Sequence, residues 1–129
     1  MSARDMRTPM ARVLGLGSAK DGVEHWWGQR VTSIALIPLT VLAILPLGRA
    51  IGAGHEAVLA TYQNPWNALV MVLFIAVTFR HLQQGLQVVI EDYVHAKPWR
   101  TGLLLANTGL CAVGGLMGVF GVLKIALAA

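Results

Sequence analysis

The residues best suited to chemistry lie in one segment, from Arg80 to His95. His81 precedes Gly85 by one helical turn and Asp92 by about three, so on a helix the three residues share one stripe. A glycine one turn from an imidazole leaves room for a large flat group, and a haem ligated through the imidazole meets that need. The alternative is a neutral histidine that hydrogen-bonds to a neighbouring helix, and the residues alone leave both readings open.

No second set of metal ligands accompanies His81. The sequence contains no HExxH or CxxC motif, no Cys/His pair at ligand spacing, no glycine-rich phosphate loop and no Ser/His/Asp arrangement. The other histidines are expected at a membrane edge or in a loop, and they are His25, His55 and His95. A second axial ligand would therefore come from another chain, which predicts a partner subunit.

Three side chains expected at one membrane boundary add to this segment. The Tyr93 hydroxyl can donate a hydrogen bond to a quinone carbonyl, and the adjacent Asp92 can relay protons from water. Alternatively, they are an interfacial tyrosine and a capping acid. Arg30 can pair with a haem propionate, although it can equally be a flanking positive charge. Arg80, about 100° round the helix from His81, receives no role from the pattern.

Membrane-spanning helices must position these residues, because the composition does not suit water. The chain has 129 residues, of which 56% are hydrophobic and 12% charged, whereas a soluble domain has about 25% charged residues. The apolar runs are long enough for a bilayer that needs about 20 helical residues. We expect a single all-α integral membrane domain, 1–129, with an N-terminal segment at 1–29 and transmembrane helices at about 30–51, 65–93 and 101–124.

The distribution of Lys and Arg predicts the topology. Seven of these residues lie on the side of the N-terminus and the second loop, and two lie on the other side. The positive-inside rule then places the N-terminus in the cytoplasm and the C-terminus in the periplasm. Scattered basic residues that flank spans do not indicate nucleic-acid binding. Gly114 and Gly118 form a small-xxx-small pair, which we interpret as general helix packing rather than a homodimer motif.

Two motifs resemble a known family. The run from His81 and Gly85 to Asp92-Tyr93, together with Arg30-x-Thr32, resembles the signature of the hydrophobic membrane anchor subunit of succinate dehydrogenase (respiratory complex II), the D type. Ser33 stands where this family commonly has alanine. The resemblance extends from about Gly17 to Tyr93. The Asp-Tyr ending distinguishes the chain from the other anchor subunit of the complex, which has its own His-x-x-x-Gly element.

The resemblance implies a fold, cofactors and partners. It implies three helices that pack with a second three-helix anchor, the cytochrome b subunit (C type), around one haem b. His81 would be an axial ligand to the haem iron, Gly85 would leave clearance and Arg30 would lie near the propionates. Tyr93 and Asp92 would belong to the ubiquinone site. FAD and iron–sulfur clusters in a flavoprotein and an iron–sulfur subunit would deliver electrons from succinate, linking the tricarboxylic acid cycle to electron transport.

The N-terminal segment lacks the Arg/Ser-rich, acid-poor composition of an organelle transit peptide, so we expect the bacterial inner membrane rather than the mitochondrial one. The resemblance implies a chain that is not an enzyme by itself. Two other classes remain open. A small transporter or channel component would use His81 and Arg80 as a polar gate and would not need haem. A purely structural assembly subunit would keep His81 as a satisfied polar contact. An optical spectrum of the purified complex distinguishes these classes from a haem-binding anchor.

Overall fold

The computed structural model describes residues 8–13 and 22–128, and nearly all of these residues are helical. No strand occurs in these two ranges, so the expected all-α class is confirmed for them. The helices are α1 (Pro9–Val13), α2 (Gly22–Ala53), α3 (His55–Gln63), α4 (Pro65–Tyr93) and α5 (Lys97–Leu127).

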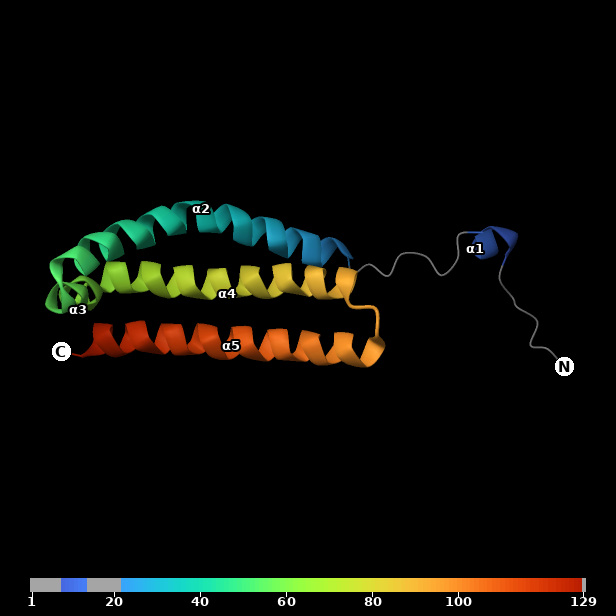
Figure 1. The fold of residues 1–129 in the computed structure, drawn as a ribbon. Helices are drawn as coiled ribbons and strands as arrows, with labels where there is room; N and C mark the ends of the chain where they lie inside the picture. The colour runs from blue at the N-terminus through green and yellow to red at the C-terminus, as the bar shows by residue number, and fades with distance from the viewer. Residues whose placement is uncertain (1–7, 14–21, 129) are drawn as a thin grey trace.

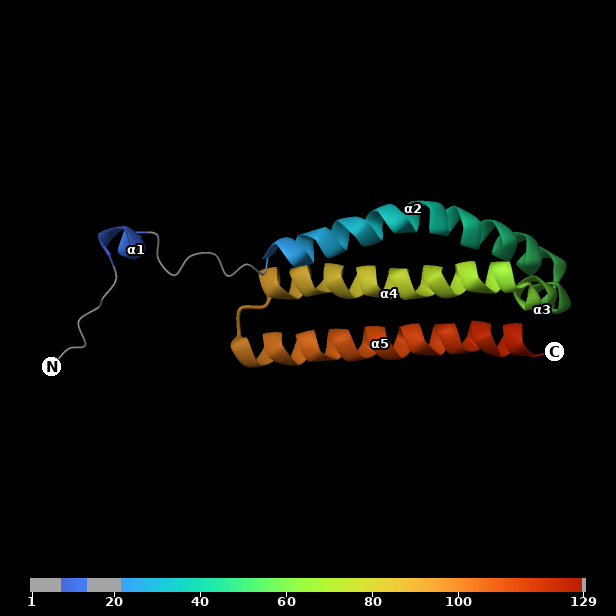
Figure 2. The same ribbon diagram turned by 180° about the vertical axis from the view of Figure 1, so that it is seen from behind.

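The three long helices lie side by side in one layer, with α4 in the middle (Figures 1 and 2). α4 packs against both α2 and α5, whose backbones do not approach each other closely. α2 bows outward along its length (Figure 1) and contains Pro38 and Pro46. Each proline removes one backbone hydrogen bond and crowds the preceding turn, which accounts for a bent helix.

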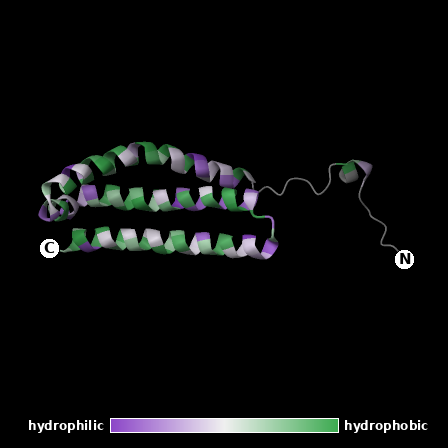
Figure 3. Cartoon of the chain, in the orientation of Figure 1, coloured by the Kyte–Doolittle hydropathy of each residue, from purple (hydrophilic) through white to green (hydrophobic). Residues whose placement is uncertain are grey.

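Each of the three long helices is long and apolar enough to cross a membrane. Apolar residues cover most of their length, and hydrophilic residues gather near the connection between α4 and α5 (Figure 3). α2 begins at Gly22 rather than at about residue 30, and α5 runs from Lys97 to Leu127 rather than from 101 to 124. The apolar pattern finds the spans, but helices continue beyond the apolar part into the interfacial zone.

The short helix α3 was not expected, because the sequence analysis placed His55 in a loop. His55 is instead the first residue of α3, and Gly54 before it adopts a φ of 99°, which favours glycine. Tyr62 near the end of α3 is 5% exposed and packs in a cluster with Ala43 and Met71. Burial against α2 and α4 therefore stabilises a helix that is too short to be stable alone.

Local signals explain where α4 begins. The Asn64 side chain accepts a hydrogen bond from the Trp66 backbone N–H at 2.9 Å, and Pro65 occupies the first turn. Both are favoured at a helix N-terminus, because the first N–H groups have no partner within the helix. These signals place the start of α4 where the apolar run begins.

Glycines bring α5 close to α4. A Cβ atom on Gly114 would lie 2.6 Å from Cε1 of Phe79, and one on Gly118 would lie 3.1 Å from Cγ2 of Ile75. Both glycines of the small-xxx-small pair therefore face a helix of the same chain, which confirms general helix packing as their role. Asn107 adds a hydrogen bond from its side-chain amide to the backbone carbonyl of Gln83, at 2.9 Å.

The layer has two different ends. The start of α2, the end of α4 and the start of α5 lie at one end, and α3 and the end of α5 lie at the other (Figure 1). The predicted site residues Arg30, Asp92 and Tyr93 belong to the first end. The assignment of this end to the cytoplasm stays a prediction.

Candidate functional site

His81 is held against the first long helix. Its Nδ1 atom lies 2.9 Å from the hydroxyl oxygen of Thr32 on α2. The same hydroxyl lies 2.9 Å from the backbone oxygen of Gly28 and 3.0 Å from that of Gln29. The stripe predicted to contain His81, Gly85 and Asp92 thus faces α2 at His81. This polar contact lies within the apolar part of both helices.

A close approach of the two helices supports this contact one turn away. Gln84 is 3% exposed, and a Cβ atom on Gly28 would lie 2.5 Å from its side-chain nitrogen. Gly28 precedes Thr32 by one turn, as His81 precedes Gln84, so the two pairs stack along the same helix interface. A larger residue at position 28 would require the Gln84 side chain to move, and the close approach here lies one turn from the contact of the Thr32 hydroxyl with the imidazole.

Gly85 also faces α2, but not tightly. A Cβ atom there would meet only the side-chain nitrogen of Gln29, at 3.6 Å, which is an ordinary van der Waals distance. Packing within the chain therefore does not require glycine at this position. The predicted clearance for a flat group at Gly85 stays a prediction.

The second ring nitrogen of His81 remains available. Nε2 makes no hydrogen bond within the described residues, and it is not among their fully buried unpartnered atoms. Those residues also contain no group of three His, Cys, Asp or Glu side chains able to hold a metal ion. A single imidazole with one engaged and one available nitrogen has the donor chemistry of a haem ligand.

Arg30 and His81 are not brought together within the chain. Arg30 precedes Thr32 by two residues, about 200° round α2, so it lies on a different face from the His81 contact. Its guanidinium carbon lies 5.4 Å from the centre of the Trp26 ring, a cation–π distance. The predicted contact with a propionate stays a prediction.

Asp92 and Tyr93 end α4 on different faces. They lie about 100° apart on the helix, and the Tyr93 side chain is 78% exposed. Neither side chain makes a hydrogen bond within the described residues. Tyr93 shares its helix face with Leu86 and Ile90, which line an apolar cleft of about 350 Å³ between α4 and α5.

Arg80 has a partner that the sequence did not reveal. Its guanidinium donates to the side-chain oxygen of Gln83 at 2.7 Å, Gln83 donates to Gln87 at 3.4 Å, and Gln87 donates to Glu91 at 2.9 Å. The chain of hydrogen bonds follows one face of α4 toward the end where it meets water. These hydrogen bonds connect a charge within the predicted span to polar groups near the membrane boundary, where a charged side chain costs less free energy.

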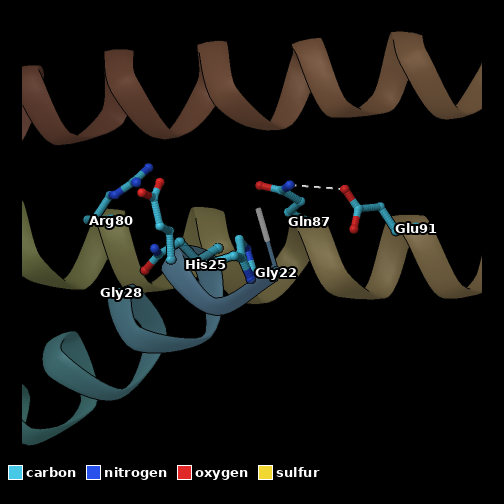
Figure 4. Close-up of a pocket in the computed structure, with 8 residues that line it drawn as sticks. Gly22, His25, Gly28, Arg80, Gln87 and Glu91 are labelled. Carbon is cyan, nitrogen blue, oxygen red and sulfur yellow. Dashed lines mark hydrogen bonds between the residues drawn. The ribbon is translucent and has the colours of Figure 1, made fainter. Parts of the chain in front are cut away.

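The same face borders a polar cleft of about 630 Å³ between α2 and α4 (Figure 4). Arg80, Gln87 and Glu91 line it from α4, and His25 lines it from α2. Two buried polar atoms of the lining residues have no partner among residues 8–13 and 22–128, Nε2 of His25 and Oε1 of Gln84. The lining of the cleft is therefore polar, with Arg80 next to His81 in the sequence.

Comparison with known proteins identifies the family of the chain. The family model described as the succinate dehydrogenase/fumarate reductase transmembrane subunit matches residues 4–116. The chain belongs to this family. It is 40% identical over 86 residues to a succinate dehydrogenase hydrophobic membrane anchor subunit of Paracoccus denitrificans, with 67% of each chain covered.

Two further succinate dehydrogenase subunits are similar to the chain. A hydrophobic membrane anchor subunit of Rickettsia bellii is 28% identical over 102 residues, which cover 79% of this chain and 82% of the relative. A membrane anchor subunit of Reclinomonas americana is 29% identical over 84 residues, which cover 63% and 70%. No solved structure matches the chain significantly. The predicted resemblance to the hydrophobic membrane anchor is confirmed, and the chain is a multi-pass membrane anchor subunit of this family.

Two residues of the anchor subunit's candidate site were not predicted from the sequence. Thr32 was noted only as part of a motif, and Gln84 was not singled out. The available signal was a pair of residues one turn apart on each span, Gly28 and Thr32 on the first and His81 and Gln84 on the second. To use this signal one must know which faces of the two helices meet, and the sequence does not provide that.

Proposed function

We propose that this anchor subunit binds haem b through Nε2 of His81 and contributes Tyr93 and Asp92 to a ubiquinone site, so that electrons from succinate reach quinone. The availability of Nε2 on an imidazole whose Nδ1 is engaged by Thr32 carries the proposal. Bound haem would supply a one-electron carrier within the membrane.

A partner chain follows from the donor set. His81 offers one nitrogen, and the described residues hold no further cluster of ligands around it. The proposal therefore includes a cytochrome b anchor subunit that gives the second axial ligand. A flavoprotein and an iron–sulfur subunit, with FAD and iron–sulfur clusters, would complete the complex, as the relatives' names imply a dehydrogenase of several subunits.

The end of α4 has the chemistry that a quinone site needs. The Tyr93 hydroxyl is exposed, has no partner in the described chain and can donate to a quinone carbonyl. Asp92 is exposed beside it and can exchange protons with water. The apolar cleft lined by Leu86 and Ile90 lies on the Tyr93 face and suits an isoprenoid tail.

The haem assignment is tested by the optical spectrum of the complex, purified through a tag on this chain and reduced with dithionite. Wild type should show b-type absorbance bands, and His81→Leu should lose or shift them. His95→Gln is the matched control, because His95 is exposed just beyond α4. An unchanged spectrum in His81→Leu would refute the assignment.

The quinone assignment needs a different assay. Tyr93→Phe should lower succinate–quinone reductase activity about 10²- to 10⁴-fold, the range typical for a lost proton donor, and leave succinate oxidation by an artificial acceptor intact. Tyr62→Phe is the control, because it changes the only other tyrosine, which is buried in α3. Equal quinone reduction in both variants would show that Tyr93 only anchors the helix.

One observation favours a second candidate, a structural subunit without haem. The hydrogen bond between His81 and Thr32 is what a satisfied intramembrane histidine would make. This candidate predicts an assembled, active complex with no b-type bands, whereas the haem-binding anchor predicts bands that depend on His81.

A further inference from the structure

We infer that Thr32 is a positioning residue for His81, which holds the imidazole proton on Nδ1 and so leaves the Nε2 lone pair for the iron. This inference rests on the proposed haem ligation and adds a residue on a different helix. The pair is formed entirely within this chain, between α2 and α4.

The direction of the hydrogen bond follows from the surroundings of the Thr32 hydroxyl. The hydroxyl has one proton and lies within bonding distance of the backbone oxygens of Gly28 and Gln29, at 2.9 and 3.0 Å. Such a bond to the preceding turn is common for threonine in helices, notably in membranes. With its proton given to a carbonyl, the oxygen presents a lone pair to His81, and Nδ1 must be the donor.

The opposite arrangement is worse on two counts. If Thr32 donated to Nδ1, the imidazole proton would lie on Nε2, which has no acceptor within the described residues. The Nε2 lone pair would also be lost, and the ring could not bind iron through that nitrogen. Donation from Nδ1 to the threonine oxygen satisfies one nitrogen and frees the other.

A metal-bound histidine whose other N–H is hydrogen-bonded has a fixed ring orientation and a more basic ligating nitrogen. A more basic nitrogen stabilises ferric over ferrous haem, so removal of the Thr32 hydroxyl should raise the midpoint potential. Loss of such a partner typically costs about 10- to 100-fold in affinity. The expected effects therefore include weaker haem retention as well as an altered potential.

The test compares Thr32→Val, which keeps the shape but removes the hydroxyl, with Thr32→Ser, which keeps the hydroxyl. Ser33→Ala is the matched control, because the Ser33 hydroxyl also donates to the Gln29 carbonyl, at 2.8 Å, and has no bond to a histidine. Each complex is purified through a tag on this chain. The measurements are haem content, the optical redox titration and the rate of haem transfer to excess apomyoglobin.

We expect Thr32→Val to lose haem about 10- to 100-fold faster than wild type, with a raised midpoint potential. Thr32→Ser and Ser33→Ala should stay near wild type. If Thr32→Val does not assemble, Thr32→Cys, whose thiol is a weaker acceptor, should show a smaller shift in the same direction.

The possible failures are distinguishable. If Thr32→Val or its substitute matches wild type, or lowers the potential, while His81→Leu loses the b-type spectrum, the role of Thr32 is refuted and the haem assignment stands. If Ser33→Ala has the same effect as Thr32→Val, the role is likewise refuted, since any lost hydroxyl on α2 would suffice. If the b-type bands are absent or do not depend on His81, both proposals fail.

Discussion

Gly114→Ala tests the close packing of α4 and α5, and its magnitude follows from the structure. The new Cβ atom would lie 2.6 Å from Cε1 and 3.1 Å from Cζ of Phe79, whereas non-bonded carbons prefer about 3.5–4.0 Å. The ring must move by about 1 Å at its near edge. Overpacking of this kind costs about 1–3 kcal/mol.

A matched substitution isolates this cost. Gly121→Ala lies on the same helix and would meet nothing within 4 Å. Both variants gain the higher helix propensity of alanine over glycine, so this gain cancels in the comparison. The free energy required to separate α5 from α4 should therefore be lower by about 1–3 kcal/mol in Gly114→Ala than in Gly121→Ala.

The chain contains its own reporter of this separation. Cys111 is the only cysteine and is buried next to the contact, one turn before Gly115. A membrane-permeable maleimide reacts with it when the two helices separate, and labelling is measured on the 13.8 kDa band after a denaturing gel. If labelling follows local opening, 1–3 kcal/mol predicts roughly 5- to 150-fold faster labelling of Gly114→Ala than of Gly121→Ala.

Equal labelling rates in the two variants would refute the close approach of the helices. The double variant Phe79→Leu/Gly114→Ala provides a second check, because the smaller side chain removes the clash. Labelling of Cys111 in the double variant should be slower than the summed effects of the two single substitutions predict, as expected for residues in contact. An additive result would mean that the alanine acts elsewhere.

Three smaller predictions concern other contacts. Asn107→Leu removes the hydrogen bond that Asn107 donates to Gln83 and the one that it accepts from the Cys111 thiol, and should lower stability in thermal unfolding of the complex by about 0.6 kcal/mol per bond. Asn64→Ala removes the cap of α4 and should lower stability by about 1 kcal/mol in thermal unfolding of the complex. Burial raises the pKa of Tyr62, so as pH rises the tyrosine ionises in the unfolded chain before it ionises in the folded chain. The folded state is therefore fully stable in this respect below the ordinary tyrosine pKa of about 10. It loses free energy of unfolding as pH rises from there through the raised pKa of the folded state. Tyr62→Phe should remove this alkaline loss in unfolding measured against pH.

The three long helices could be predicted from the sequence, because they coincide with long runs of apolar residues. The start of α4 coincides with the expected one, because an apolar run, a capping asparagine and a proline agree there. The short helix α3 was missed because its stability comes from contacts of Tyr62 with residues far along the chain. A nine-residue helix with little apolar periodicity gives no local signal.

The candidate site was predicted only in part for a similar reason. His81 stood out as an ionisable residue at membrane depth, and its stripe with Gly85 does face α2. Its partner Thr32 could not be identified, because that requires knowing which face of α2 meets α4. Arg30 illustrates the converse, since proximity in the motif did not predict that it lies on a different face from the histidine contact.

Polar groups without a partner in the described part of the chain gather where α2 meets α4. Three buried side-chain atoms near the polar cleft have no partner within the described residues, Nε2 of His25, Oε1 of Gln29 and Oε1 of Gln84. Each would cost about 1–3 kcal/mol if left unpaired, and together they would consume much of the 5–15 kcal/mol or so by which proteins are stable. Arg80 adds a guanidinium with five N–H donors and one acceptor in the described chain, Gln83. Arg80 is exposed, so water, a cofactor or a partner helix can supply further acceptors on this face of α4, next to His81.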